Sequence, residues 1–345
     1  MQPLVSVIIL NYNGARWMER CLASLKRQSI LSQLEVIVAD NQSSDGSDEL
    51  SKKLLSDFPA GRFIQNGGNL GYCEGNNRPA GIALGEYLLF LNNDTWLEPD
   101  CLEKLVSEVQ KTGADAATPL ICNYEDASFQ SLGAGGFDIF GLSSTRLPHT
   151  ETREVLMPEG SAYLIRRELF NQLGGFDPKF FMYADEMDLS WRVWVSGHKA
   201  VAVPKARLHH RSAAAANPSG GGSIVELRTN ATTRYYSNRN SLLVILKSAQ
   251  HILLSSVVLQ IALLGVEALV AAVVTRNKTF VRRAYWDATI DCWTLRQHIL
   301  DQRRRIRAFR KRSDWWMLRF FRLRLNRWDE ILRIRRMGLP KVSGH

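Results

Sequence analysis

Apolar and polar positions along the first 110 residues follow a repeating pattern of strand, loop and helix. Residues 4–10 form a continuous apolar and β-branched run, which is typical of a buried strand. Polar NYNG follows, and apolar residues then recur at helical spacing from Trp17 to Leu25. Further strands are predicted at residues 34–39, 62–65 and 86–91, and a helix near residues 99–111. Strands that alternate with helices predict an α/β, Rossmann-like fold with a mainly parallel central sheet flanked by helices.

The middle of the chain has a weaker pattern. Residues 120–160 include Gly-rich LGAGGF and few clear periods, so we expect an irregular segment that covers the site. Residues 159–173 predict one helix, which ends at Gly174 and Gly175. An acidic helix follows within YADEMDLSWR, residues 183–192.

Polar side chains gather at or just after the ends of the predicted strands, where ligands bind in open parallel sheets. Asp40 follows a buried strand and can accept hydrogen bonds from a nucleobase or ribose, although a turn aspartate is the alternative. Asp94 follows Asn92 and Asn93, an oxygen set that suits one hard divalent cation shared with phosphates. An ordinary Asn-Asp turn is the alternative there.

The acidic helix has two interpretations. Asp188 and Arg192 stand one turn apart and are predicted to pair. Asp185 and Glu186 then lie at the helix N-terminus, where they either stabilise the first turn or supply a general base. His210, or His209 beside it, either completes a metal shell or is a solvent-facing loop histidine.

Common catalytic motifs are absent from the sequence. It contains no GxxxxGK[ST], GxGxxG or HExxH pattern and no Ser-His-Asp order. A P-loop enzyme and an ordinary dinucleotide-binding protein are therefore disfavoured.

An ordered set of motifs resembles glycosyltransferase family 2 of the GT-A fold. The motifs are VSVIILNYNG, VADNQSSDGS, NLGYCEGNN, LLFLNNDT, GGFDPKFF and DEMDLSWR, and they cover about residues 4–212. The resemblance implies that the region of Asp40 holds the nucleotide base and that Asp94, with His210, binds Mg²⁺ or Mn²⁺ on the donor diphosphate. Together with the positions at the strand ends, it makes the following residues candidates for contact with a nucleotide sugar: Asn11, Tyr12, Asn13, Asp40, Asn69, Asn76 and Asn93.

Two residues depart from the family pattern. Asn92 replaces the first aspartate of the usual metal motif, which leaves Asp94 as the anionic ligand. The acidic pair reads Asp185-Glu186 where the family usually has Glu-Asp, so Glu186 is expected to be the base by position, with Asp185 as the rival. The resemblance implies single displacement with inversion, and a rhamnosyltransferase-like activity. The processive QxxRW motif is not matched by QRRRI at residues 302–306, so we expect one sugar per encounter.

The composition of the chain bears on its cellular compartment and its partners. The net charge of +10 divides unevenly, because residues 276–345 hold 20 Lys and Arg against 6 Asp and Glu, whereas residues 1–275 hold 24 against 28. Five scattered cysteines indicate neither a disulfide framework nor a zinc site. The first residues lack a basic leader, so the N-terminal domain is expected in the cytoplasm. We expect a catalytic domain at residues 1–240 and a membrane-associated helical region at 241–345.

Residues 252–275 form an apolar run with one charge, Glu267, long enough to cross a bilayer. A single span would place the basic tail opposite the cytoplasmic domain, against the positive-inside tendency. Ser256, Gln260 and Glu267 fall on one helical stripe, so a helix in the interface or a re-entrant pair is preferred, and a buried core helix is the alternative.

The basic tail has two interpretations. RRRIRAFRKR followed by WWMLRFF fits nucleic-acid binding by charge and stacking. Alternatively, one apolar helical face opposite the arginines suits an anionic leaflet, namely Met317, Phe321, Leu325, Trp328 and Leu332. We prefer the second, with no nucleic-acid partner: a glycosyltransferase at the cytoplasmic membrane face that elongates a lipid-linked glycan or polysaccharide acceptor. YYSNRN before the apolar run adds to the resemblance with membrane-associated members.

Overall fold

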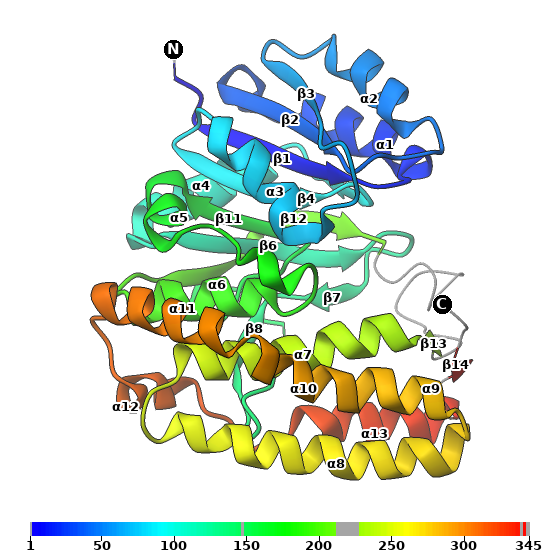
Figure 1. Ribbon diagram of the computed structural model, residues 1–345. Coiled ribbons are helices and arrows are strands. Elements are labelled where there is room, and N and C mark those ends of the chain that lie inside the picture. The colour runs from blue at the N-terminus through cyan, green and yellow to red at the C-terminus, as the bar shows by residue number, and fades with distance from the viewer. Residues whose placement is uncertain (1, 146–147, 212–227, 339–340, 343–345) are drawn as a thin grey trace.

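The computed structural model describes residues 2–145, 148–211, 228–338 and 341–342. Within these residues, one sheet of ten strands forms the upper part of the molecule, with helices on both faces (Figure 1). Its main path runs β10-β12-β6-β11-β4-β1-β2-β3, while β5 pairs with β12 and β7 pairs with β6. The strands of this sheet are β1 (Val5–Asn11), β2 (Leu34–Asp40), β3 (Gly61–Gln65), β4 (Tyr87–Asn92), β5 (Thr95–Leu97), β6 (Ala116–Asn123), β7 (Phe129–Ser131), β10 (Arg153–Glu154), β11 (Ala162–Arg166) and β12 (Ala200–His210).

Helices of the sheet region cover its two faces. They are α1 (Ala15–Lys26), η1 (Leu31–Gln33), α2 (Ser47–Leu55), α3 (Gly71–Ile82), α4 (Cys101–Thr112), α5 (Arg167–Leu173), η2 (Pro178–Phe180) and α6 (Asp185–Val195). Two small pairings lie outside the main sheet, between β8 (Ala134–Phe137) and β9 (Ser143–Thr145) and between β13 (Arg228–Thr229) and β14 (Lys341–Val342).

The register of the central strands brings their polar ends to one edge. β1 pairs in parallel with β2 and β4, so Asn11 lies opposite Asp40 and Leu10 lies opposite Asn92. Apart from the buried polar pair Ser6 and Glu35, the residues of these strands before their polar ends are apolar, and helices packed on both faces form two hydrophobic cores with them. The predicted α/β fold with a mainly parallel sheet is confirmed.

The prediction of one helix over residues 159–173 is wrong in its first half. Ala162–Arg166 forms strand β11, which lies antiparallel to β4 and β6. Only Arg167–Leu173 forms a helix, α5. A central strand with both faces buried is a continuous apolar run, and periodicity alone does not separate such a run from a buried helix.

The expectation of an irregular segment at residues 120–160 is wrong in part. β6 begins at Ala116, pairs in parallel with β12 and continues to Asn123. The short strands β7, β8, β9 and β10 follow. Each has only two to four residues, so none produces a readable period.

A helical layer lies below the sheet in Figure 1 and is made by the C-terminal part of the chain. It contains α7 (Ala231–Ser248), η3 (Leu253–Ser255), α8 (Ser256–Thr275), α9 (Lys278–Val281), the π-helix η4 (Arg282–Asp287), α10 (Ala288–Thr294), α11 (Arg296–Phe309), α12 (Asp314–Met317), η5 (Leu318–Phe320) and α13 (Asn326–Met337). The predicted boundary at residue 240 falls inside α7, and the division into two regions stays a prediction.

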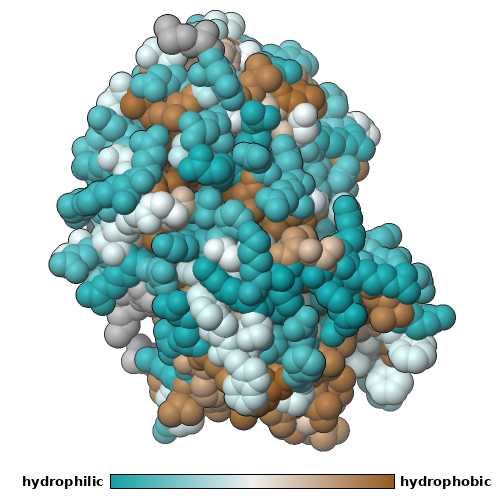
Figure 2. All heavy atoms as spheres, turned by 90° about the vertical axis from the view of Figure 1, so that its left-hand side faces the viewer, coloured by the Kyte–Doolittle hydropathy of each residue, from teal (hydrophilic) through white to brown (hydrophobic). Residues whose placement is uncertain are grey.

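Helix α8 is the apolar element of this layer. Leu253–Thr275 is the one segment, in the part of the chain that the structure describes, long and apolar enough to cross a membrane by length and composition. Its predicted polar stripe is confirmed, because Ser256 and Gln260 are buried and Glu267 pairs with Arg327 at 2.7 Å. Val257 and Leu264 are buried on the same helix, whereas most of its other apolar side chains are exposed, and apolar side chains gather on the lower end of the molecule in Figure 2.

The basic tail does not form the single apolar helical face that its spacing predicts. The backbone is extended at Phe321 and Leu325, between η5 and α13, and this breaks the helix. Met317 is therefore buried, whereas Trp328 is 52% exposed. Spacing along a chain defines a face only where the helix is continuous.

Three arginines of the segment RRRIRAFRKR, residues 303–312, cap other helices. Arg303 donates to the carbonyls of Leu246 and Ala249, and Arg310 to that of Ser248, at the C-terminal end of α7. Arg312 does the same at the end of α6, where it donates to the carbonyls of residues 194, 197 and 198. Cations stabilise helix C-termini, where carbonyls lack partners. This part of the tail charge is used inside the fold.

A buried charge cluster joins the sheet region to the helical layer. Lys247 of α7 contacts Asp188 at 2.9 Å and also pairs with Asp177. Asp188 pairs in turn with Arg192 at 2.7 Å, which confirms that prediction. Burial alone would raise the pKa of Asp177, but Lys247 and His298 outweigh it and hold that pKa below its ordinary value. Both carboxylates therefore depend on a cation from the C-terminal helices.

We expect Lys247→Met to destabilise the fold by about 3–5 kcal/mol at pH 7, because it leaves buried carboxylates without their cation. Because the pKa of Asp177 is lowered in the folded state, the stability that it contributes is present above its unfolded pKa, about 4, and is lost as the pH falls below that value. Urea unfolding should therefore show a smaller difference between wild type and variant at pH 3 than at pH 7. Exposed Lys179→Met is the control, with an expected change within about 0.5 kcal/mol. Equal stability of Lys247→Met and wild type at pH 7 would contradict the role of this cluster.

Candidate active site

The polar ends of β1, β2 and β4 are tied to one another by side-chain hydrogen bonds. Asn11 Nδ2 donates to Asp40 Oδ1 at 2.8 Å and to Ser47 Oγ at 2.8 Å. Asn93 Nδ2 donates to Asn11 Oδ1 at 2.9 Å. Gly14 packs directly on this contact, since a Cβ there would lie 2.1 Å from Asn93 Nδ2. Asn11 and Asn93 thus join three strand ends into one rigid edge.

Asp40 is fully buried at this edge and stays ionised. Burial raises its pKa, but hydrogen bonds from Ser43, Asn11 and Gln65 outweigh that effect and leave the pKa below its ordinary value. The side chain is therefore a fixed acceptor with a full negative charge.

The other predicted donor contacts divide into open and engaged side chains. Tyr12 is 51% exposed at the rim. Asn13 Oδ1 accepts from the amide of Ser44 at 2.8 Å. Asn69 Oδ1 accepts from the amide of Gly71 at 3.1 Å, while buried Asn76 donates to the carbonyl of Tyr72 inside α3. Asn76 therefore faces its own helix, whereas Tyr12 is open to solvent.

Asp94 and His210 come together at the ends of β4 and β12. His210 Nε2 lies 3.3 Å from Asp94 Oδ1, and His210 Nδ1 lies 3.0 Å from Gln130 Oε1. His209 points elsewhere and stacks on Trp96 with the ring centroids 3.6 Å apart. Successive residues of a strand face opposite sides, so only one of the two histidines can reach Asp94.

The donor set of this pair suits a divalent cation that is shared with a ligand. In the described residues, no group of three or more His, Cys, Asp and Glu side chains converges to hold a metal by protein ligands alone. One carboxylate and one imidazole leave most coordination positions to other oxygens, as in sites where Mg²⁺ is bound partly by substrate phosphates. The contact with Gln130 fixes the orientation of the imidazole, as hydrogen bonds to the second ring nitrogen of metal-binding histidines do.

The acidic pair occupies two different environments at the start of α6. Asp185 is 5% exposed, and burial, then the charge of Glu186, raises its pKa well above the ordinary range. Glu186 is half-buried and lines a polar cavity of about 220 Å³. Burial, with a contribution from the charge of Glu159, raises the pKa of Glu186 to about 7. Glu186 is therefore the acid of the pair that both lines a cavity and titrates near neutral pH.

The turn before α6 has an unusual backbone that α7 holds in place. Phe181, Tyr183 and Ala184 all have positive φ, which side chains with a Cβ rarely adopt. Asn240 Nδ2 lies 2.7–2.9 Å from the carbonyl oxygens of Phe180, Met182 and Tyr183. Arg239 adds a hydrogen bond to the carbonyl of Lys179 at 2.6 Å. Asn240 of α7 thus fixes the turn that positions Asp185 and Glu186 at the start of α6.

Sequence reasoning did not single out Gln130, Glu159, Arg239 or Asn240. Glu159 accepts a hydrogen bond from Ser131 and lies within electrostatic reach of both Glu186 and His210. The polar run SNRN within YYSNRN is the one sequence signal for Asn240, because polar residues that interrupt an otherwise apolar helix indicate a hydrogen-bonding role. Arg239 lies in the same run, whereas nothing local marks Gln130 or Glu159, since their contacts are long-range.

Similarity to known proteins identifies the family. The sequence pattern described as Glycosyl transferase family 2 matches residues 6–174. An N-acetylglucosaminyl-diphospho-decaprenol L-rhamnosyltransferase of Mycobacterium tuberculosis is 30% identical over 244 residues, which cover 61% of this chain and 78% of that protein. The chain belongs to glycosyltransferase family 2. It is a glycosyltransferase, as the ordered motifs predicted.

Solved structures of glycosyltransferases share the fold. A polypeptide GalNAc-T7 structure with UDP, GalNAc and Mn²⁺ has a TM-score of 0.53 at 21% identity, over 61% of this chain and 43% of that one. A mannosyltransferase of Pyrobaculum calidifontis with GDP-Man and Mn²⁺ has a TM-score of 0.52 at 17% identity, over 88% of this chain and 86% of that one. At these identities the likeness establishes the GT-A fold.

We expect Asn240→Leu to lower kcat for sugar transfer by about tenfold or more, since the strained turn loses the contacts that hold it and a tenfold change needs only about 1.4 kcal/mol. The KM for the nucleotide sugar should change little, because the donor candidates lie at the sheet edge. Steady-state kinetics in which donor and acceptor are varied separately measures both effects. Exposed Thr232→Ala on the same helix is the control. A change in donor KM with unchanged kcat would show that the turn does not serve the acidic pair.

Proposed function

We propose that this glycosyltransferase moves one sugar, with inversion, from a nucleotide-diphosphate sugar to a hydroxyl of a lipid-linked or polysaccharide acceptor. The observation that best supports this proposal is the presence of two different polar sites. One is the polar edge of the sheet with Asp40, Asp94 and His210, and the other is the cavity that Glu186 lines. The edge suits the donor, and the cavity suits the acceptor. The mycobacterial relative supports a deoxyhexose such as that of dTDP-rhamnose as the first donor to test.

In the proposed reaction, Glu186 takes the proton of the acceptor hydroxyl as its oxygen attacks the anomeric carbon. The bond from that carbon to the diphosphate breaks, a new bond to the acceptor oxygen forms, and the nucleoside diphosphate leaves. A pKa of about 7 keeps roughly half of Glu186 ionised at neutral pH, which suits a general base. Asp185, being buried with a raised pKa, is the rival but lacks a place in the cavity lining.

On the donor side, we propose that Asp94 and His210 bind Mg²⁺ or Mn²⁺. Such a cation would neutralise charge on the departing diphosphate. Gln130 would keep His210 Nε2 directed at Asp94 by accepting from Nδ1. Asp40 would accept hydrogen bonds from the base or ribose, and Tyr12 and Asn13 at the rim, with Asn69, would complete the pocket.

We also propose that α8 lies in the membrane interface, at the cytoplasmic face, instead of crossing the bilayer. Glu267 and Arg327 pair beside the middle of the helix, and α13, which supplies Arg327, would have to enter the hydrocarbon region with a spanning α8. An interfacial helix needs only its open apolar side covered by lipid. Flotation with anionic vesicles tests this placement, and retention of the protein with the soluble fraction would contradict it. Arg303, Arg310 and Arg312, which cap the C-terminal ends of α7 and α6, give the nucleic-acid alternative no support.

The function is tested by turnover of a donor panel that includes dTDP-rhamnose, UDP-sugars and GDP-mannose. We expect turnover of one donor to be lost in EDTA and restored by Mn²⁺. His210→Phe should weaken Mn²⁺ binding by roughly tenfold to a hundredfold, measured by electron paramagnetic resonance without any acceptor. His209→Phe is the matched control, because its ring can still stack on Trp96. Equal Mn²⁺ affinity of both variants would overturn the assignment of His210.

For the base, we expect the rate of transfer to rise with pH through about 7 and then level off, because Glu186 acts in its ionised form and its pKa is raised to about 7. Glu186→Gln should lower kcat by about 10²–10⁴-fold and remove this pH dependence, with little change in donor binding. Asp185→Asn is the comparison variant. If Glu186→Gln retains full transfer while Asp185→Asn abolishes it, the base is Asp185.

A further inference from the structure

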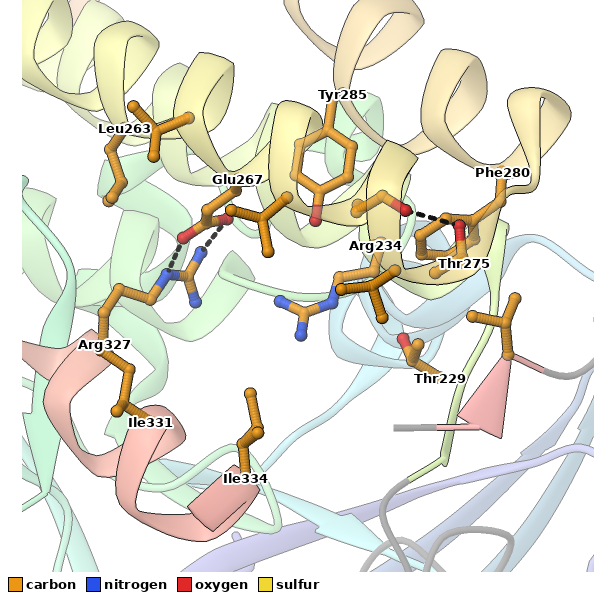
Figure 3. Close-up of a pocket in the computed structure, with 15 residues that line it drawn as sticks. Thr229, Arg234, Leu263, Glu267, Thr275, Phe280, Tyr285, Arg327, Ile331 and Ile334 are labelled. Atoms are coloured by element: carbon orange, nitrogen blue, oxygen red, sulfur yellow. Dashed lines mark hydrogen bonds and ion pairs between the residues drawn. The ribbon is translucent and has the colours of Figure 1, made fainter. Parts of the chain in front are cut away.

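A second cavity lies along α8, on the side of the helical layer that faces α13. It has a volume of about 330 Å³, near the lower end of the range of about 300–1,000 Å³ for small-ligand sites. Its walls are mostly apolar and include Leu263, Val266, Val270, Phe280 and Ile331. Figure 3 shows α8 in the upper part of the view and α13 at the lower left, with Tyr285 and Phe280, which also line the cavity, beside α8. We call this cavity the α8 groove.

The α8 groove adjoins the open apolar side of α8. Val266 and Val270 line the groove and are 59% and 56% exposed, and Leu269 and Val273 beside them are 71% and 76% exposed. Apolar surface of this extent is covered in the working protein by lipid or by a partner. A hydrocarbon chain from a bilayer in contact with α8 can therefore enter the groove without crossing water.

The α8 groove adjoins the polar cavity that Glu186 lines. Arg327 contributes to the walls of both cavities. On α7, Arg234 lines the groove, and Ser237 and Ser241 line the polar cavity. Residues three and four apart share one face of a helix, so a single face of α7 runs from one cavity to the other.

The order of chemistry along this path is apolar, then cationic, then polar and acidic. Glu267 holds the guanidinium of Arg327 at the junction, with 2.7 Å between Nε and Oε1 (Figure 3). Guanidinium groups bind phosphates well because they offer several N–H donors in one plane. A molecule with a hydrocarbon chain, a phosphate linkage and a sugar has its parts in the same order.

We propose that the α8 groove binds the hydrocarbon chain of a lipid-diphosphate-linked acceptor, with the diphosphate at Arg327 and the acceptor sugar in the cavity of Glu186. This assignment rests on the proposed function, because it takes Glu186 as the group that meets the acceptor hydroxyl. The shared wall at Arg327 favours the acceptor over a bulk membrane lipid, because only the acceptor has a sugar that must reach Glu186.

The test uses the full-length chain on vesicles of phosphatidylcholine and phosphatidylglycerol. The probe is geranylgeranyl diphosphate that carries a benzophenone at the far end of the chain. We expect photolabelling in peptides of α8 and α13, which excess unlabelled geranylgeranyl diphosphate prevents and added phosphatidylglycerol does not. Val270→Trp should lower this labelling by roughly tenfold, because the indole occupies the groove.

Val273→Trp is the matched control. It makes the same substitution on the same helix, at a residue that is exposed but does not line the groove, so labelling should stay at the wild-type level. Flotation should be equal for both variants, which separates loss of the groove from loss of membrane binding. Equal loss of labelling in both variants, unchanged labelling in Val270→Trp, or full competition by phosphatidylglycerol would each overturn the proposal.

Failure of the proposed function gives a different result. Groove labelling that depends on Val270, without turnover of any donor in the panel, would leave a lipid-diphosphate site and reject the proposed transfer. Turnover of a donor with a lipid-linked acceptor, without groove labelling, would retain the transfer and reject the groove as the site of the lipid.

Discussion

The buried contact of Lys247 with Asp177 and Asp188 is the constraint on which the rest of the structure depends. Each carboxylate belongs to the sheet region and is almost fully buried, and the cation that compensates both comes from α7. Uncompensated buried charge costs several kcal/mol, so the sheet region and the helical layer cannot separate without large loss of stability. Helices beyond residues 6–174, the part of the chain that matches the family, therefore contribute to the stability of the sheet region.

The same helix determines the environment of the acidic pair. Asn240 lies two helical turns before Lys247 on α7. It holds the strained turn that precedes Asp185 and Glu186. Two adjacent carboxyls of similar intrinsic acidity are thereby separated by their surroundings, one enclosed in the core and the other facing a cavity. Divergent environments for paired acids are a usual way to give them different protonation states.

Much of the fold was predictable because it depends on local patterns. Buried parallel strands appear as continuous apolar runs. The spacing of four residues between Asp188 and Arg192 predicts their ion pair on a helix. Strand β11 was misassigned because a short apolar run carries no period, and the tail was misread because its helix breaks near Phe321. The roles of Asp94, His210 and Glu186 remain predictions, although the fold brings Asp94 and His210 to adjoining positions.

Other parts of the candidate site were beyond sequence reasoning for a physical reason. Gln130 reaches His210 across 80 positions, and Asn240 reaches the turn at 180–183 across about 60. Contacts of this kind depend on how helices cross, which no local propensity encodes. The arginines of the tail are a related case. Their number gives the charge of the segment but does not predict that some of them donate to carbonyls at helix C-termini.

The position of Asn240 has a consequence for how the chain matures. Protein domains generally fold from the N-terminus as they are synthesised. The sheet region, including the turn at Phe181–Ala184, is synthesised before α7, yet that turn receives the amide that holds it only when residue 240 has been added. The polar edge formed by the ends of β1, β2 and β4 does not need α7, whereas the acidic pair reaches its final geometry only after α7, the helix that precedes apolar α8, has been synthesised.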